Sequence, residues 1–140
     1  MSKLYMGFDA GTQSVKVAVY DEQFNCLTSH SLPTHLHYPQ PGWVEMSADE
    51  FLEITVKSMA ACAQSLREMG RDPKDVCAVM GDGIICGIVG VNPDGDAVTP
   101  YINYLDSRTT PDVEALNARE LEIWGRETGN PVASPMFPAM

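Results

Sequence analysis

Apolar runs separated by polar turns predict strands at the start of the chain. Leu4–Phe8 and Val15–Tyr20 are two such runs, and the polar octet Asp9–Lys16 between them is then the tight turn of a hairpin. After a polar turn at residues 21–25, the run Cys26–Pro33 predicts a third strand. The pattern therefore predicts that the chain opens with a hairpin and a further strand.

Apolar residues then recur at three- and four-residue steps, which predicts a helix over about residues 47–69. Ser47 and Glu50 fit a Ser-x-x-Glu capping box at its start. Gly70 is expected to end the helix, and Pro73 prevents its return. The apolar positions form one stripe that should cover a face of the sheet: Leu52, Val56, Met59, Ala63 and Leu66.

The next segments predict further strands around a turn. Val76–Met80 is almost wholly apolar, which is typical of a buried strand reached by a crossover from the helix. Ile84–Val91 predicts a strand interrupted by glycine. The polar turn Asn92–Asp96 follows, and Val98–Leu105 is expected to return as the partner strand.

Two short helices are expected toward the carboxyl terminus. Thr110 would cap the first, with Pro111 at its first position. The second would span Glu120–Trp124 and end at Gly125. The segment Thr128–Met140 contains no signal for a helix or a strand, so the chain is expected to stop in mid-structure.

Length and composition are those of one globular domain, because 140 residues with 44% hydrophobic and 20% charged side chains can bury a core. The net charge is −10 and the nine Lys and Arg residues are scattered. No basic stripe results, so neither nucleic acid nor an anionic membrane is expected as a partner. No apolar run reaches the length of a membrane span, and the start leads into a strand rather than a secretory segment, so we expect a cytoplasmic protein.

The cysteines lie in or beside apolar segments and show no Cys-x-x-Cys spacing. Reduced, largely buried thiols are therefore a better interpretation than disulfides or a zinc site. The cysteines concerned are Cys26, Cys62, Cys77 and Cys86. The histidines His35 and His37 lie on an irregular loop and are interpreted as surface residues rather than metal ligands.

The octet Asp9–Lys16 is the main candidate for chemistry. Its turn brings backbone N–H groups, hydroxyls and the Lys16 ammonium together, a combination that binds phosphate. Asp9 would repel a bare phosphate, so a divalent cation is expected between the two. The alternative is a glycine-containing hairpin with solvated polar residues. The octet is not the Gly-x-x-x-x-Gly-Lys-Ser/Thr loop and opens no helix, which excludes a P-loop enzyme.

Separate segments, in matching order and spacing, resemble the FGGY carbohydrate kinases and in particular their xylulose-kinase-like branch. The octet resembles the first phosphate motif of the sugar-kinase, Hsp70 and actin superfamily. Pro41–Glu45 and Asp94–Pro100 match further stretches of the family, and Tyr104–Arg108 stands where the family has Trp-x-Asp-x-Arg. The resemblance runs from Gly7 to about Pro131.

By this resemblance, residues 1–140 are the N-terminal part of the first lobe of an FGGY kinase, with the second lobe absent. The implied fold is α/β, a ribonuclease H-like mixed sheet with flanking helices, here incomplete. The cofactors would be ATP and Mg²⁺, and the γ-phosphate would pass to a hydroxyl of a sugar or polyol such as xylulose, ribulose or glycerol. Asp9 would hold Mg²⁺ through water, and Lys16 would face the transferring phosphoryl group. The residues implied in binding the nucleotide phosphates are Gly11, Thr12, Gln13, Ser14 and Lys16.

The sugar contacts depart from the family's pattern. Where the xylulose-kinase branch has a Gly-Gln-Met-His-Gly-like stretch, this chain has apolar residues within Gly83–Gly87, which argues against ordinary D-xylulose specificity. Two alternatives stay open. Asp82 either replaces the missing acceptor or caps a turn, and Asp106 and Arg108 either contact the sugar or form a structural brace, which we favour. The residues assigned to the substrate are Asp82, Gly83, Ile85, Asp106 and Arg108.

The remaining aromatic residues have structural interpretations. Trp43 either lines a pocket or, as we favour, acts as an aromatic staple before the helix, and Tyr101 and Tyr104 are interpreted as core or rim residues.

No general base for a sugar hydroxyl is evident, and the family's aspartate is expected beyond Met140, so this piece alone is expected to lack kinase activity. The alternative function is a non-catalytic module that binds a small ligand or self-associates. Exposed apolar surface is expected to produce a homodimer or other self-association.

Overall fold

The computed structural model describes residues 3–119 and 121–136. Over these ranges the chain divides into two compact units. Unit 1 joins the chain up to His35 with Asp49–Ile84, and unit 2 joins Leu36–Ala48 with the described chain from Ile85 onward.

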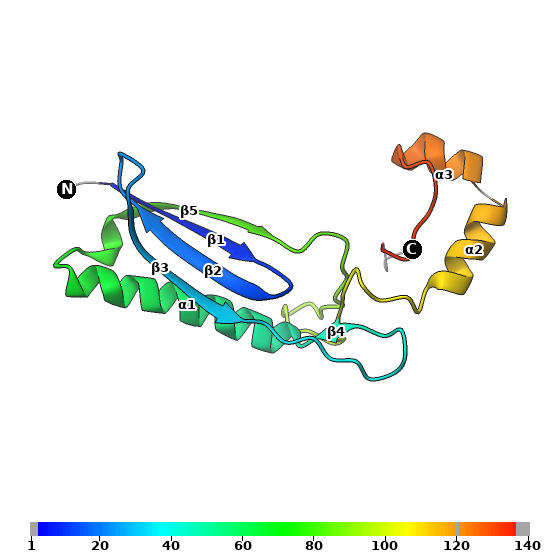
Figure 1. Cartoon of the computed structure of the whole chain (residues 1–140), viewed down its shortest axis with the longest axis horizontal. Helices are drawn as coiled ribbons and strands as arrows, with labels where there is room; N and C mark the ends of the chain where they lie inside the picture. Colours follow the sequence, from blue (N-terminus) through cyan, green and yellow to red (C-terminus); the bar gives the residue numbers. More distant parts are fainter. Residues whose placement is uncertain (1–2, 120, 137–140) are drawn as a thin grey trace. The chain divides into compact units, whose positions relative to one another are not determined.

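Unit 1 is a four-stranded mixed sheet with one long helix beside it (Figure 1). The strand order is β3-β2-β1-β5, with β1, β2 and β3 antiparallel and β5 parallel to β1. The helix α1 supplies the crossover to β5, so the predicted hairpin, third strand, helix and crossover are confirmed. The elements are β1 (Leu4–Ala10), β2 (Ser14–Tyr20), β3 (Cys26–Pro33), α1 (Ala48–Glu68) and β5 (Val76–Gly83).

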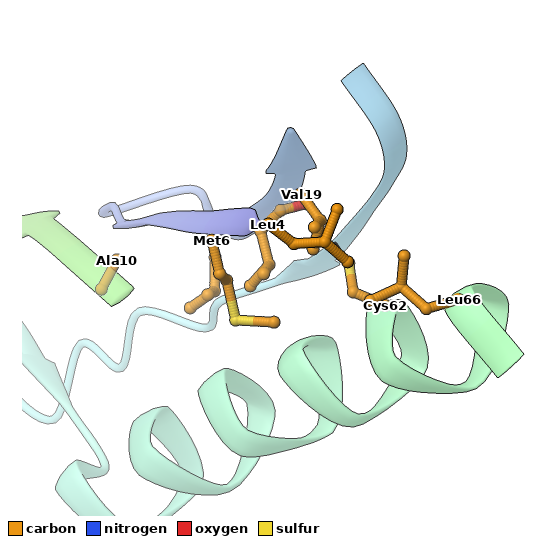
Figure 2. Packing of buried hydrophobic residues seen from close by; sticks show 8 residues of the cluster. Leu4, Met6, Ala10, Val19, Cys62 and Leu66 are labelled. Atoms are coloured by element: carbon orange, nitrogen blue, oxygen red, sulfur yellow. Dashed lines mark hydrogen bonds between the residues drawn. The ribbon is translucent and has the colours of Figure 1, made fainter. Parts of the chain in front are cut away.

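The core of unit 1 lies between the sheet and α1. Every second residue of β2 is buried, because successive side chains of a strand point to opposite faces. Cys62 and Leu66 of α1 point toward the buried face (Figure 2). The other face of the sheet, away from α1, is called the open face below. The buried cluster consists of Leu4, Met6, Ala10, Val15, Val17, Val19, Cys62 and Leu66.

The buried side of α1 differs from the predicted stripe. Leu66 is fully buried, but Leu52 and Val56 are 65% and 55% exposed, so their predicted burial is wrong. The helix instead turns Ser58 and Cys62 inward together with Leu66. Apolar residues occur on more than one side of this helix, so periodicity alone did not determine which side meets the sheet. Residues partly buried at the margin of the cluster are Phe51, Ile54 and Met59.

The helix stops where the sequence predicts. Gly70 adopts a φ of +73°, a left-handed conformation that glycine tolerates. Its N–H donates to the Arg67 carbonyl at 2.9 Å, and the Arg71 N–H donates to the Leu66 carbonyl at 2.9 Å. These two bonds form a Schellman motif. The short 3₁₀ helix Pro73–Asp75 then leads into β5.

β5 is an exposed edge strand, so the prediction that Val76–Met80 is buried is wrong. Of this strand only Val76 packs against the core cluster, whereas Val79 and Met80 are 57% and 79% exposed. The physical reason is that the cluster is built from β1, β2 and α1, and does not extend along β5. An apolar run indicates side chains suited to burial, but it does not supply the element that covers them.

Unit 2 contains little regular structure. The strand β4 (Glu45–Met46) pairs with β6 (Tyr101–Ile102), and Ile88 forms an isolated bridge with Ile102. The predicted strands over residues 84–91 and 98–105 are therefore wrong, apart from these short pairings.

The turn between those segments is confirmed. The Asn92 side chain accepts the N–H groups of Asp94 and Asp96 at 3.0 and 2.8 Å. Cys86 has a φ of 68°, outside the extended region, and this interrupts the first predicted strand. Beside these side-chain bonds, backbone pairing across the turn is limited to a bridge between Val91 and Ala97 and a bond from the Val98 N–H to the Gly90 carbonyl at 2.8 Å.

Two short helices follow, α2 (Thr110–Arg119) and α3 (Leu121–Thr128), with ends that differ from the prediction. The Thr110 hydroxyl donates to the Ser107 carbonyl at 2.7 Å, so it does not cap α2. The first helical bond instead runs from the Val113 N–H to the Thr109 carbonyl.

The end of α3 is also shifted. Gly125 lies inside the helix, and Gly129, with a φ of +73°, ends it. The predicted first residue, Glu120, lies outside the described residues. From Gly129 to Met136 the described chain has no helix or strand, as predicted, and residues 137–140 are not described.

All the cysteines are free thiols, as predicted, but they are not all buried. Cys62 is buried, whereas Cys26 and Cys77 are exposed, which corrects that part of the prediction. Burial raises the pKa of the Cys62 thiol. Within the described residues, no helix is long and apolar enough to cross a membrane.

Candidate phosphate-binding site

The strands of the hairpin extend into the octet and leave a turn of Gly11–Gln13. Asp9 pairs with Lys16 across the hairpin, one position before the last pair, Ala10 with Val15. Because Ala10 and Val15 are buried, the side chains of Asp9 and Lys16 lie on the open face, where both are exposed. Within the described ranges, neither side chain forms a hydrogen bond or an ion pair.

A row of polar residues crosses the open face beside the turn. Asp9 is paired with Lys16 on β2 and with Asp82 on β5, and Lys16 is paired with Ser31 on β3. Residues paired across adjacent strands project to the same face. We call Ser31, Lys16, Asp9 and Asp82, in this order across the sheet, the polar row. The Lys16 ammonium therefore lies beside the Asp9 carboxylate, and the Asp82 carboxylate lies on the other side of Asp9.

The open face is hollowed next to the polar row. One hollow of about 540 Å³ includes Asp9, Lys16 and Ser31 in its lining. A second hollow of about 380 Å³ has an apolar lining that includes Tyr5, Phe24 and Met80. The open face is therefore polar near the turn and apolar farther along the strands.

The turn presents its backbone N–H groups rather than its carbonyls. The Gly11 N–H donates to the Ser14 carbonyl at 3.0 Å, and the carbonyls of Gly11, Thr12 and Gln13 all face donors from Thr34. The N–H groups of Thr12 and Gln13 have no acceptor in the described part of the chain. A turn whose carbonyls are engaged and whose N–H groups remain open is suited to an anion.

The acidic residues of the polar row suit a magnesium ion shared with phosphates. Among the residues that the structure describes, no three His, Cys, Asp or Glu side chains form a metal cluster. Mg²⁺ usually takes one or two carboxylates, water and substrate phosphate oxygens, so Asp9, with Asp82 beside it, matches that need. Asp82 also accepts the Gly83 N–H through Oδ1 at 2.8 Å, a bond between adjacent residues of β5.

Asp106 and Arg108 form an ion pair inside unit 2, the brace favoured from the sequence. The Arg108 Nε and Nη2 atoms lie 2.9 and 2.8 Å from the two Asp106 carboxylate oxygens, and Nη2 also lies 2.7 Å from Glu45 Oε1. Asp106 is 2% exposed and also accepts the Val44 N–H at 2.6 Å. Both of its oxygens are therefore engaged within unit 2.

The network changes the pKa values of its members. Burial is the largest influence on Asp106 and opposes its ionisation, but hydrogen bonds from Arg108 and Val44 outweigh it and lower the pKa of this carboxyl. Its hydrogen bond to Asp106 is the main cause that raises the pKa of Arg108. The guanidinium also lies 3.8 Å above the Trp43 ring, a cation–π contact that the sequence analysis missed.

The segment Gly83–Gly87 is tightly packed at one point. A Cβ on Gly87 would overlap the end of the Tyr101 side chain, so any larger residue here requires that side chain to move. The Tyr101 hydroxyl is buried without a partner in the described chain, and burial raises its pKa. Ile85, two residues earlier, is 75% exposed.

The structure brings together only part of the predicted site. Asp9, Lys16, Asp82 and Gly83 are neighbours on the sheet of unit 1, with the turn at one end. Ile85, Asp106 and Arg108 belong to unit 2. Sequence reasoning gave no role to Thr34, and it named Glu45 only within the Pro41–Glu45 match and not as a partner of Arg108.

Residues 4–140 match the N-terminal domain of the FGGY family of carbohydrate kinases. The chain belongs to this family. A glycerol kinase from Geobacter sp. (strain M21) is 30% identical over 138 residues, which are 96% of this chain and 27% of that protein. A xylulose kinase from Staphylococcus xylosus is 24% identical over 109 residues, which are 78% of this chain and 22% of that protein.

Solved structures support the fold of this FGGY domain. The crystal structure of gluconate kinase from Lactobacillus acidophilus superposes with a TM-score of 0.84 at 22% identity, covering 97% of this chain and 26% of that one. The predicted mixed α/β lobe is confirmed. The relatives include both glycerol and xylulose kinases, so they establish the family and not the xylulose-kinase-like branch. The chain spans about a quarter of the length of these relatives.

Proposed function

We propose that this chain supplies the phosphate-binding turn of an ATP-dependent carbohydrate kinase. The observation that carries the proposal is the turn Gly11–Gln13, with its carbonyls engaged and the N–H groups of Thr12 and Gln13 open beside Lys16. The reaction would transfer the γ-phosphate of ATP to a hydroxyl of a sugar or polyol. Because the chain spans about a quarter of its relatives, catalysis is proposed for a polypeptide of their full length, and not for this segment alone.

Each residue of the site has a separate part in this proposal. The N–H groups of the turn and the hydroxyls of Thr12 and Ser14 would hold phosphate oxygens. Lys16 would neutralise charge on the phosphoryl group in transfer, which needs positioning and charge stabilisation more than covalent help. Asp9 would hold Mg²⁺ through water, and the bound ion would supply further neutralisation of the phosphates.

We assign the substrate contacts to Asp82 and the residues that follow it rather than to Asp106 and Arg108. Asp82 lies on the open face next to Asp9 and is well placed to accept a bond from a substrate hydroxyl. Gly83 and Ile85 continue the same segment and are proposed as its neighbours at the substrate. Asp106 and Arg108 are better explained as the brace of unit 2, because both oxygens of Asp106 are already engaged. We also propose a cytoplasmic location, because the reaction consumes ATP.

Lys16→Met tests the proposal in a kinase-length polypeptide that contains this segment. Loss of the ammonium should lower kcat by about 100-fold, since it removes charge stabilisation from the transition state, and leave KM for the sugar within about twofold. Lys57→Met is the matched control, because Lys57 is exposed on α1, away from the turn in sequence, and pairs with Glu53. Equal losses for both variants, or a higher sugar KM with unchanged kcat for Lys16→Met, would contradict the proposal.

The edge strand β5 supports a second, independent proposal, self-association of this chain as a homodimer. β5 pairs on one side only and exposes Val79 and Met80, and such an edge is a template for another strand. Sedimentation velocity should show a dimer at high protein concentration. A monomer at every concentration would rule this association out.

A further inference from the structure

Thr34 directly follows β3 and is hydrogen-bonded to the carbonyls of the turn at residues 11–13. The register of β2 and β3 pairs Ser14 with Pro33, which brings the next residue, Thr34, to Gln13. We propose that Thr34 is a positioning residue for the phosphate site. It holds the carbonyls of the turn on one side, so that the turn's N–H groups face the anion on the other.

Three consecutive carbonyls of the turn face this one residue. The Thr34 N–H donates to the Gln13 carbonyl at 3.1 Å. The Thr34 hydroxyl donates to the Thr12 carbonyl at 2.6 Å and lies 3.4 Å from the Gly11 carbonyl. A hydroxyl has a single proton to donate, so the Thr34 hydroxyl donates to the nearer carbonyl, that of Thr12, and its contact with the Gly11 carbonyl is the weaker one.

Peptide geometry turns these bonds into an orientation for the N–H groups. A trans peptide is planar, and its C=O and N–H point in opposite directions. Holding the Thr12 carbonyl toward Thr34 therefore directs the Gln13 N–H away from it, and the Gly11 carbonyl, 3.4 Å from the same hydroxyl, places the Thr12 N–H on that side as well. Successive N–H groups that point one way form a concavity for an anion.

The chain next to Thr34 is anchored independently of the turn. His35 Nδ1 lies 2.6 Å from Glu50 Oε1 in the first turn of α1. On its other side, Thr34 is joined to β3, which is paired with β2. Thr34 is thus held between a strand and a side-chain hydrogen bond at His35, so it can set the orientation of the turn rather than follow it.

The anion that this arrangement fits is the polyphosphate of a nucleotide. This identification rests on the proposed function, because Lys16 and Asp9 beside the turn are there assigned to phosphate and to Mg²⁺. The role of Thr34 concerns binding and orientation, and it takes no part in bond making.

Titration of a ¹⁵N-labelled kinase-length polypeptide that contains this segment with Mg·ATP, followed by amide chemical shifts, tests the role of Thr34. Thr34→Val keeps the shape and the backbone N–H but removes the hydroxyl, whereas Thr34→Ser retains the hydroxyl. Thr34→Val should weaken binding about tenfold, as expected for one hydrogen bond, and should shift the Thr12 and Gln13 amide signals before ligand is added. Thr34→Ser should bind within about twofold of the unsubstituted chain.

Thr55→Val is the matched control, because the Thr55 hydroxyl also donates to a carbonyl, that of Phe51 within α1. It should leave Mg·ATP affinity unchanged. Equal affinity of Thr34→Val and the unsubstituted chain would overturn the role of Thr34 alone. Failure of the unsubstituted kinase-length polypeptide to bind Mg·ATP would instead overturn the proposed function, and the ligand named here with it. Equal loss of affinity in Thr34→Ser and Thr34→Val would show that shape, and not the hydroxyl, matters.

Discussion

The two units of the chain are stabilised by different kinds of interior. Unit 1 buries an apolar cluster between a regular sheet and α1. Unit 2 has strands of two residues, and buries Asn103 and Asp106 among its few apolar side chains. In unit 1 regular strands satisfy the backbone, whereas in unit 2 short backbone bridges are supplemented by buried side chains: Asp106 accepts the Val44 N–H and Asn103 accepts the Leu105 N–H. The comparison teaches that buried polar groups supplement backbone pairing where loops dominate.

The largest expected effect comes from the interior of unit 2. Asp106→Ala removes one partner of a buried ion pair and leaves the Val44 N–H unsatisfied, so it should lower the free energy of unfolding by about 4 kcal/mol. Both tryptophans, Trp43 and Trp124, belong to unit 2, so denaturation followed by tryptophan fluorescence reports this loss. Asp94→Ala, at an exposed turn residue, should cause a change within about 0.5 kcal/mol. Similar effects of the two substitutions would break the comparison.

The same carboxylate predicts a pH dependence. The pKa of Asp106 is lowered in the folded chain, so its contribution to stability is fully present above the unfolded pKa of about 3.9. It is lost as the pH falls through the folded pKa. The fluorescence transition should therefore weaken below about pH 4, and Asp106→Ala should show less of that acid dependence. An identical acid dependence in the variant would exclude Asp106 as its source.

A somewhat smaller effect is expected from the apolar interior of unit 1. Leu66→Ala should lower the free energy of unfolding by about 3 kcal/mol, because Leu66 is fully buried in the cluster. Leu52→Ala makes the same change on the same helix at a residue that is 65% exposed, and should cost less than about 0.5 kcal/mol. Urea denaturation followed by far-UV circular dichroism compares the two. If Leu52→Ala were the more costly change, the predicted stripe and not the observed face would be the buried one.

The smallest predicted effect on stability compares one glycine on each face of the sheet: Gly81, paired with Phe8 on the buried face, and Gly7 on the open face. Gly81→Ala should destabilise unit 1 by about 1 kcal/mol, since its Cβ would lie 2.1 Å from Cζ of Phe8 and the ring must move. Gly7→Ala on the open face meets nothing within 4 Å and should be neutral or slightly stabilising. Melting temperatures of the two variants test this. A lower melting temperature for Gly7→Ala than for Gly81→Ala would contradict the assignment of the two faces.

Much of the candidate site was predictable, because it lies on a local element. The hairpin and the pairing of Asp9 with Lys16 follow from two apolar runs on either side of a short polar segment. The position of Asp82 beside Asp9 required the crossover to β5, which the pattern also indicated. Thr34 was not predictable, since its role depends on the exact register of β3 against β2 and on a turn that lies 22 residues away from it.

The sequence by itself determined where the hairpin, the third strand and α1 lie, and where α1 stops. These features depend on residues close together in the chain, such as Gly70 and the last turn of α1 that it closes. Only the tertiary structure decided which side of α1 is buried, that β5 is exposed, and that Asp106 reaches the Val44 backbone across 62 residues. The physical reason is that burial and hydrogen bonding depend on what lies opposite a side chain, and a linear pattern does not contain that partner.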